Sequence, residues 1–139
     1  MFDFFGPKKR AEKHKILVVD DEPDLVLMLQ DRLEMSGYEV VTASNGKEGL
    51  EKAIEDEPDV VLLDVRMPVM DGLEMLETLR KHPEGVGRVV IMVSARSQRE
   101  DLTRAEACGV KDYVVKPFEL SALIEKIGEV LERRKAAVK

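Results

Sequence analysis

Five short apolar runs recur along the chain at regular intervals. They lie at residues 16–19, 38–42, 60–63, 89–93 and 113–115. Several are continuous and rich in β-branched residues rather than alternating with polar ones, which is typical of strands covered on both faces. The pattern therefore predicts five strands of a parallel sheet.

The segments between these runs have helical periodicity and recognisable start signals. An N-cap residue followed three positions later by a reciprocal acid occurs at Asn45 and Glu48, at Asp71 and Glu74, and at Ser97 and Glu100. Pro23 stands where a first-turn proline is expected after Asp21 or Glu22. Gly37 and Gly109 follow the first and fourth helical segments, at expected C-caps.

The last helical segment is the clearest. Its apolar residues fall on one face, at Leu120, Leu123, Ile124, Ile127, Val130 and Leu131. A strand and a helix repeated five times predict an α/β fold with right-handed crossovers, a doubly wound (βα)5 parallel sheet with helices on both faces. We expect one domain over residues 15–135, a flexible tail over 1–14 and a short tail over 136–139.

Composition narrows the class of protein. Hydrophobic residues make up 44% of the 139 residues and charged residues 36%, which is typical of a globular protein. No apolar run approaches the length of a membrane span, and the basic residues of the N-terminus follow its apolar ones, unlike those of a signal peptide. Cys108, the single cysteine, is expected to be a small core residue. We expect a cytoplasmic protein.

The net charge of −6 is unevenly distributed. Residues 1–15 carry five Lys or Arg against two acids, which leaves −9 on residues 16–139. An acidic body repels phosphate backbones, and four Phe, two Tyr and no Trp offer few rings on which bases could stack. We therefore expect no direct binding of nucleic acid.

Three carboxylates follow the first and third predicted strands. Asp20 and Asp21 come directly after residues 16–19, and Asp64 comes directly after residues 60–63. Ligands of an open parallel sheet bind at the carboxyl ends of the strands, so in a strand order 2-1-3-4-5 these acids share one crevice. Because unpaired carboxylates repel one another, a hard cation such as Mg²⁺ is their natural partner. The alternative is that the doublet complements the dipole of the next helix.

Ser94 and Lys116 follow the fourth and fifth predicted strands. In the same crevice, a hydroxyl and an ammonium supply the hydrogen-bond donor and the positive charge that a phosphoryl group needs. Each is a weak signal alone, because a serine before a helix is more often a cap and a lysine near a strand end is more often solvated.

Four segments, in this order and spacing, resemble the receiver domain of two-component response regulators. They are VVDDEPD, LLDVRMPVMDG, VSARS and DYVVKPF, and the resemblance covers about residues 14–133. It implies the flavodoxin-like receiver fold with strand order 2-1-3-4-5. It also implies a signalling protein that takes a phosphoryl group from a sensor histidine kinase or a phosphotransfer protein.

By this resemblance Asp64 is the phosphoacceptor. Asp21 and Asp64 coordinate Mg²⁺, or Mn²⁺, together with the backbone carbonyl of Arg66, while Asp20 acts mainly through a metal-bound water. Two cations occupy positions that usually vary in the family: Arg66, two residues beyond Asp64, and Arg96, two residues beyond Ser94. They either screen the acyl phosphate from water or are simply solvated, and both interpretations stay open.

The resemblance further implies a conformational switch. Lys116 pairs with one phosphoryl oxygen, Ser94 hydrogen-bonds another, and the peptide bond between Lys116 and Pro117 is expected to be cis. As Ser94 moves, Tyr113 turns into the vacated space and changes the surface of the fourth helix, fifth strand and fifth helix. The alternative for Tyr113 is an ordinary strand aromatic.

Rival families fit less well. A haloacid-dehalogenase-type phosphatase needs a second acid where this chain has Arg66, and a flavodoxin-like cofactor binder needs donors in a loop that here offers carboxylates. A receiver-like interaction module that is never phosphorylated is the remaining alternative. We expect no enzyme activity beyond the chain's own phosphorylation and dephosphorylation.

We expect no output domain after the receiver segment and therefore a resemblance to the stand-alone, chemotaxis-regulator-like members that relay a phosphoryl group or bind a protein target. The N-terminal segment MFDFFGPKKRAEKHK combines three Phe with basic residues. It either docks on a partner or an anionic membrane surface or is a solvated extension.

Overall fold

The computed structural model describes residues 13–95 and 99–138. Arg96 and Ser97 lie outside these ranges, as do residues 1–12 of the N-terminal segment. Strands and helices alternate in the order β1 (Lys15–Val19), α2 (Pro23–Met35), β2 (Glu39–Ala43), α3 (Gly46–Glu55), β3 (Val60–Leu63), α4 (Gly72–Lys81), β4 (Val90–Ser94), α5 (Arg99–Ala107), β5 (Asp112–Val115) and α6 (Leu120–Val138).

The five strands form one parallel sheet of order β2-β1-β3-β4-β5. This confirms the predicted fold class and strand order, and each strand lies within one residue of the predicted ends. The order places β1 and β3 side by side in the middle of the sheet, so their carboxyl ends are neighbours.

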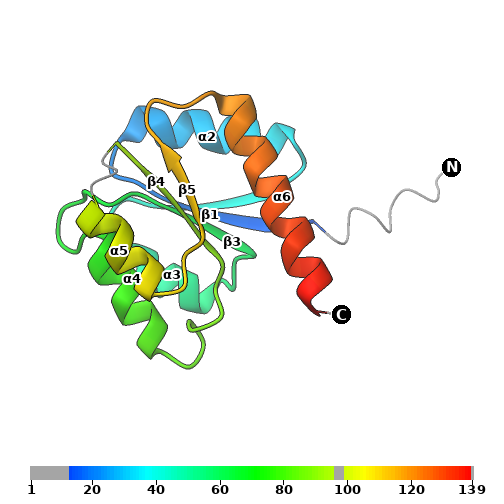
Figure 1. The fold of residues 1–139 in the computed structure, drawn as a ribbon. Coiled ribbons are helices and arrows are strands. Elements are labelled where there is room, and N and C mark those ends of the chain that lie inside the picture. Colours follow the sequence, from blue (N-terminus) through cyan, green and yellow to red (C-terminus); the bar gives the residue numbers. More distant parts are fainter. Residues whose placement is uncertain (1–12, 96–98, 139) are drawn as a thin grey trace, which may run out of the picture.

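Helices cover both faces of the sheet (Figure 1). Alternate residues of each strand point to opposite faces. In β1, Leu17 and Val19 pack into a core with α3, α4 and α5, whereas Ile16 and Val18 pack into a second core with α2 and α6. Burial on both faces explains why the strands read as continuous apolar runs.

The predicted helix signals act as local stabilisers. The side chain of Asn45 accepts a hydrogen bond from the Glu48 amide, and Asp71 with Glu74 forms a reciprocal capping box. Gly37 and Gly109 adopt φ angles of 97° and 84°, the left-handed conformation that favours glycine after a helix.

The C-terminal helix is longer than its apolar stripe indicated. It continues to Val138, past residue 135 where we placed the end of the domain. None of the helices in the described ranges is long and apolar enough to cross a membrane.

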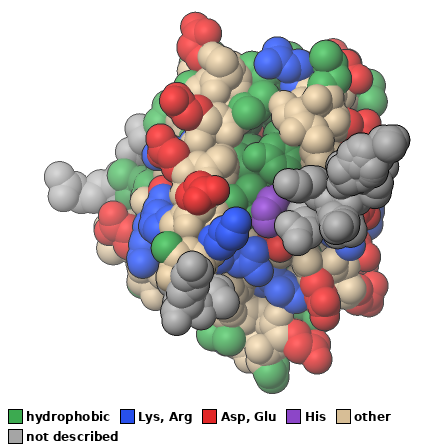
Figure 2. Space-filling view, turned by 90° about the vertical axis from the view of Figure 1, so that its right-hand side faces the viewer, with side chains coloured by type: hydrophobic (Ala, Val, Ile, Leu, Met, Phe, Trp, Pro, Cys, Tyr) green, Lys and Arg blue, Asp and Glu red, His purple; other side chains and the backbone are tan. Residues whose placement is uncertain are grey.

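Charge is distributed unevenly over the surface. Figure 2 shows the end of the molecule at which the strands begin, where Lys and Arg side chains gather near the middle and Asp and Glu lie mainly around them. The carboxylate cluster described below lies at the opposite end, where the strands finish.

Candidate functional site

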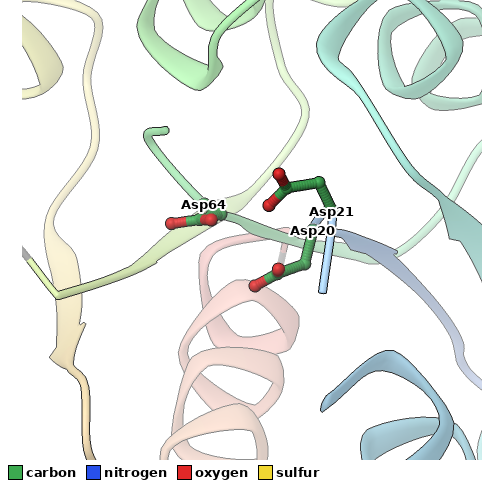
Figure 3. A group of neighbouring side chains, drawn as sticks. All are labelled: Asp20, Asp21 and Asp64. Atoms are coloured by element: carbon green, nitrogen blue, oxygen red, sulfur yellow. The ribbon is translucent and has the colours of Figure 1, made fainter. Parts of the chain in front are cut away.

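Three aspartates meet at the carboxyl ends of β1 and β3. Asp20 and Asp21 directly follow β1, and Asp64 directly follows β3. The amide of Asp64 donates to the carbonyl of Val19 at 3.0 Å, which extends the sheet pairing to the acids themselves. One carboxylate oxygen from each aspartate lies within 4.8 Å of the others. Figure 3 shows the three side chains projecting from the strand ends in the same general direction.

Two of these carboxylates are buried. The exposed fraction is 4% for Asp20 and 6% for Asp64, whereas Asp21 is exposed. One oxygen of each buried carboxylate has a backbone donor: Asp20 Oδ1 accepts from the Glu22 amide at 2.9 Å, and Asp64 Oδ1 accepts from the Val65 amide at 2.8 Å. The site is therefore held in place by local backbone and has a solvent side at Asp21.

Lys116 supplies positive charge to the cluster. Its Nζ lies 2.9 Å from Asp20 Oδ2, 2.9 Å from Glu22 Oε1 and 3.6 Å from Asp64 Oδ2. Burial disfavours the charged form of Lys116, but the hydrogen bonds to Asp20 and Glu22 outweigh burial and raise its pKa. The bond between Lys116 and Pro117 is cis. The sequence analysis did not identify Glu22 as a partner of this lysine.

The environment of Asp64 disfavours its charged form. Burial and then the charge of Asp20 raise the pKa of Asp64 from 3.8 to about 6, against the opposing effects of Lys116 and the Val65 amide. Asp64 is therefore mostly ionised at neutral pH and protonated near pH 5.

Ser94 and Tyr113 lie on the adjacent strands β4 and β5, where Ser94 pairs with Val115 and Tyr113 pairs with Met92. Ser94 is the last residue of β4 and is buried, and its carbonyl accepts from the Lys116 amide at 3.0 Å. Tyr113, in the neighbouring strand β5, is half-buried, and its hydroxyl donates to the carbonyl of Leu102 in α5 at 3.2 Å. Tyr113 thus connects β5 to α5, which its sequence position alone could not show.

A cavity of about 670 Å³ opens beside the carboxylates. Its polar lining includes Asp21, Glu22, Asp64, Arg66, Ser94 and Lys116, and its apolar lining is Leu25, Met28, Ala95, Pro117 and Phe118. The structure therefore brings together the predicted site residues of four strand ends. Arg66 is exposed at this cavity, and Arg96 lies outside the described residues. The apolar wall was not predicted, because no motif marks it.

The donor set fits a hard divalent cation. Three carboxylates and one additional acid, Glu22, face a single ammonium from Lys116, so the cluster keeps an excess of negative charge. Carboxylate oxygens are the ligands that Mg²⁺ prefers in proteins. The exposed side of the cluster at Asp21 leaves room for water or phosphate oxygens to complete its coordination.

Comparisons with known proteins agree with this architecture. The family model described as "Response regulator receiver domain" matches residues 16–128. The chain is 41% identical over 120 residues to the transcriptional regulatory protein PrrA of Mycobacterium tuberculosis, which covers 86% of this chain and 51% of PrrA. It is 39% identical over 123 residues to the alkaline phosphatase synthesis transcriptional regulatory protein PhoP of Bacillus subtilis, covering 88% of this chain and 50% of PhoP.

Solved structures of response regulators have the same fold as this chain. A CheY-like response regulator receiver domain protein from Methanospirillum hungatei superposes with a TM-score of 0.85 at 32% identity, covering 91% of this chain and 99% of that one. The chemotaxis protein CheY4 of Vibrio cholerae superposes with a TM-score of 0.79 at 33% identity, covering 85% of this chain and 98% of that one. The chain spans about half the length of the curated relatives it matches. It belongs to the family of response regulator receiver domains of two-component systems.

Proposed function

We propose that Asp64 accepts a phosphoryl group from a phosphohistidine on a sensor histidine kinase or phosphotransfer protein. The observation that carries this proposal is the position of Asp64, buried at the end of β3 within 4.8 Å of two other carboxylates and next to the ammonium of Lys116. The family membership of the chain supports the same role.

The two oxygens of Asp64 are not equivalent. Oδ1 accepts a hydrogen bond from the Val65 amide, and Oδ2 lies 3.6 Å from Lys116 Nζ. We therefore assign the attack on phosphorus to Oδ2. The new bond joins this oxygen to phosphorus, the bond between phosphorus and the donor's imidazole nitrogen breaks, and that nitrogen keeps the electron pair. A phosphoryl group on Oδ2 is within reach of the Lys116 ammonium.

A divalent cation belongs to this proposal. Asp20, Asp21, Asp64 and the backbone carbonyl of Arg66 would hold Mg²⁺ or Mn²⁺, and the bound ion would neutralise charge that develops on the phosphoryl oxygens. Ser94, which lines the same cavity, would donate a hydrogen bond to the phosphoryl group. The chain would then catalyse only its own phosphorylation and dephosphorylation.

The signal would leave through α5, β5 and α6. Ser94 and Tyr113 lie on adjacent strands, and the Tyr113 hydroxyl is bound to α5, so a movement of Ser94 can change how Tyr113 and α5 are held. The altered surface would bind a protein target or permit relay of the phosphoryl group. This output rests on the same phosphorylation step.

Phosphorylation can be tested with a small phosphodonor. The chain is incubated with acetyl phosphate and Mg²⁺, and the intact mass is followed beside an Asp64→Asn variant and a sample with EDTA. The proposal predicts the gain of one phosphoryl group that is absent in both controls. No gain in a folded protein that still binds Mg²⁺ would contradict it and favour an interaction module that is never phosphorylated.

A further inference from the structure

A second cavity, of about 700 Å³, lies at the end of the sheet where the strands begin. Its walls come from the turn between α4 and β4, the turn between α5 and β5, and the last turns of α6. Its apolar lining is Val86, Val89, Val90, Ala107, Cys108 and Val130. We call this cavity the basic cleft, because five cations also line it: Arg80, Arg88, Lys111, Arg133 and Arg134.

Two of the five cations are neutralised by acids. Arg133 makes two hydrogen bonds to the carboxylate of Asp112, at 3.0 and 3.2 Å. Arg134 donates to Asp59 at 2.8 Å. Arg80, Arg88 and Lys111 have no carboxylate within ion-pair distance in the described part of the chain. The basic cleft therefore holds three cations without a counter-charge on a protein whose residues 16–139 carry −9.

The two arginines among these three are held in place by backbone carbonyls. Arg80 is half-buried, and it donates from Nε to the Cys108 carbonyl at 2.6 Å and from Nη1 to the Arg88 carbonyl at 2.8 Å. Arg88 donates from Nε to the Ala53 carbonyl at 2.8 Å. Carbonyls orient a guanidinium without neutralising it, and within residues 13–95 and 99–138 neither Arg80 Nη2 nor the Nη atoms of Arg88 make a hydrogen bond.

We propose that the basic cleft binds an anion that carries phosphate groups, such as a nucleotide or a polyphosphate. The two Nη atoms of Arg88 can bind a pair of phosphate oxygens, Arg80 Nη2 can bind another oxygen, and the three cations match the charge of a di- or triphosphate. The cleft has the volume of a small-molecule site, and its valines can cover an apolar part of the ligand. Because the cleft and Asp64 lie at opposite ends of the sheet, this ligand is not the phosphoryl donor.

Cys108 provides a direct readout of binding. It is the single cysteine of the chain and lines the basic cleft, so a bound ligand slows its alkylation by the neutral reagent iodoacetamide. The full chain is labelled in EDTA with millimolar ATP, inorganic triphosphate or adenosine. The labelling rate with each compound is divided by the rate without it.

The key variant is Lys111→Gln, because Lys111 is exposed and makes no hydrogen bond or ion pair in the described ranges, so the fold does not depend on it. The control is Arg32→Gln, which removes the same charge from the exposed side of α2. We expect ATP and triphosphate, but not adenosine, to slow labelling by about threefold or more at saturation. The dissociation constant is expected to rise about tenfold in Lys111→Gln, the effect of one lost charge-assisted hydrogen bond, and to stay unchanged in Arg32→Gln.

The relative protection by ATP and triphosphate shows which part of the ligand the basic cleft recognises. Stronger protection by ATP than by triphosphate identifies a nucleotide, and equal protection identifies the phosphate chain as the recognised part, so both support the site. The absence of protection by either compound overturns the proposal. So does protection that Lys111→Gln and Arg32→Gln weaken equally, since binding would then follow net charge rather than the cleft.

Discussion

The charge state of Asp64 depends on burial and on two neighbours. Burial and Asp20 disfavour the carboxylate, and Lys116 favours it. The balance raises the pKa to about 6, so the proposed phosphoacceptor is ionised at neutral pH at a cost in folding free energy.

Removal of this carboxylate is therefore expected to stabilise the metal-free protein. The pKa of Asp64 is higher in the folded state, so well below pH 3.8 both states are protonated and the group has no effect, whereas above about pH 6 the folded state holds an unfavourable charge. The shift corresponds to at most about 3 kcal/mol, and we expect a gain of about 1–2 kcal/mol for Asp64→Asn at neutral pH.

Urea unfolding in EDTA measures this effect. The gain of Asp64→Asn should be present near pH 7.5 and largely lost near pH 4. Asp31→Asn, an exposed acid on α2, should change the free energy of unfolding by less than about 0.5 kcal/mol at either pH. A less stable Asp64→Asn protein near pH 7.5 would show that the carboxylate is favourably paired.

Lys116 is expected to compete with a divalent ion for the same carboxylates. In Lys116→Gln the ammonium no longer contacts Asp20 and Asp64, so the affinity for Mg²⁺ should rise about two- to tenfold. Titration calorimetry measures the affinity, with Lys81→Gln as an exposed control. If phosphorylation requires the Lys116 ammonium, the rate of phosphorylation should fall in Lys116→Gln although Mg²⁺ binds more tightly. An unchanged or lower affinity for Mg²⁺ would contradict the competition between Lys116 and the ion.

The start of α4 packs against the backbone of Asp64 and Val65. The Gly72 amide donates to the Val65 carbonyl at 2.8 Å, and a Cβ at Gly72 would overlap the carbonyl of Asp64. This close approach fixes the position of Asp64 relative to a helix whose capping box holds its first turn.

A pair of glycine substitutions tests this packing. Gly72→Ala is expected to destabilise the protein by more than about 2 kcal/mol, because backbone rather than a flexible side chain must move. Gly128→Ala in α6 meets no atom within 4 Å and should instead stabilise by up to about 1 kcal/mol through helix propensity. Thermal unfolding distinguishes the two, and equal effects would contradict the close approach.

The tyrosines allow a matched test of the contact between β5 and α5. Tyr113→Phe removes the hydrogen bond to the Leu102 carbonyl and should lower stability by about 0.5–1.5 kcal/mol, with faster amide exchange in α5. The control for Tyr113→Phe is Tyr38→Phe, because the Tyr38 hydroxyl makes no hydrogen bond in the described ranges. Unchanged exchange in α5 would show that Tyr113 does not hold this helix.

At the scale of the whole molecule, the sheet was predictable because burial on both faces requires continuous apolar runs in the central strands β1, β3 and β4. The acids, Ser94 and Lys116 were predictable for a related reason: each directly follows such a run, and parallel strands finish at the same edge. The helix starts at Asn45 and Asp71 were predictable from local capping chemistry alone.

Features that depend on several distant segments were not predictable. Glu22 lies at the start of α2 but contributes no cap, because its carboxylate contacts Lys116, which is 94 residues away. The basic cleft combines residues of α4, two turns and α6 that share no motif. Similarly, the pKa of Asp64 follows from packing rather than from its position in the sequence.

The central claim is that Asp64 carries the phosphoryl group, and locating the modification tests it most directly. The chain is treated with acetyl phosphate and Mg²⁺ and then with borohydride, which reduces an aspartyl phosphate to homoserine with release of phosphate. Tandem mass spectrometry of the peptides then identifies the converted residue. Homoserine at position 64 alone, and none without Mg²⁺, is the predicted result; homoserine at position 20 or 21, or none at all, would contradict the account.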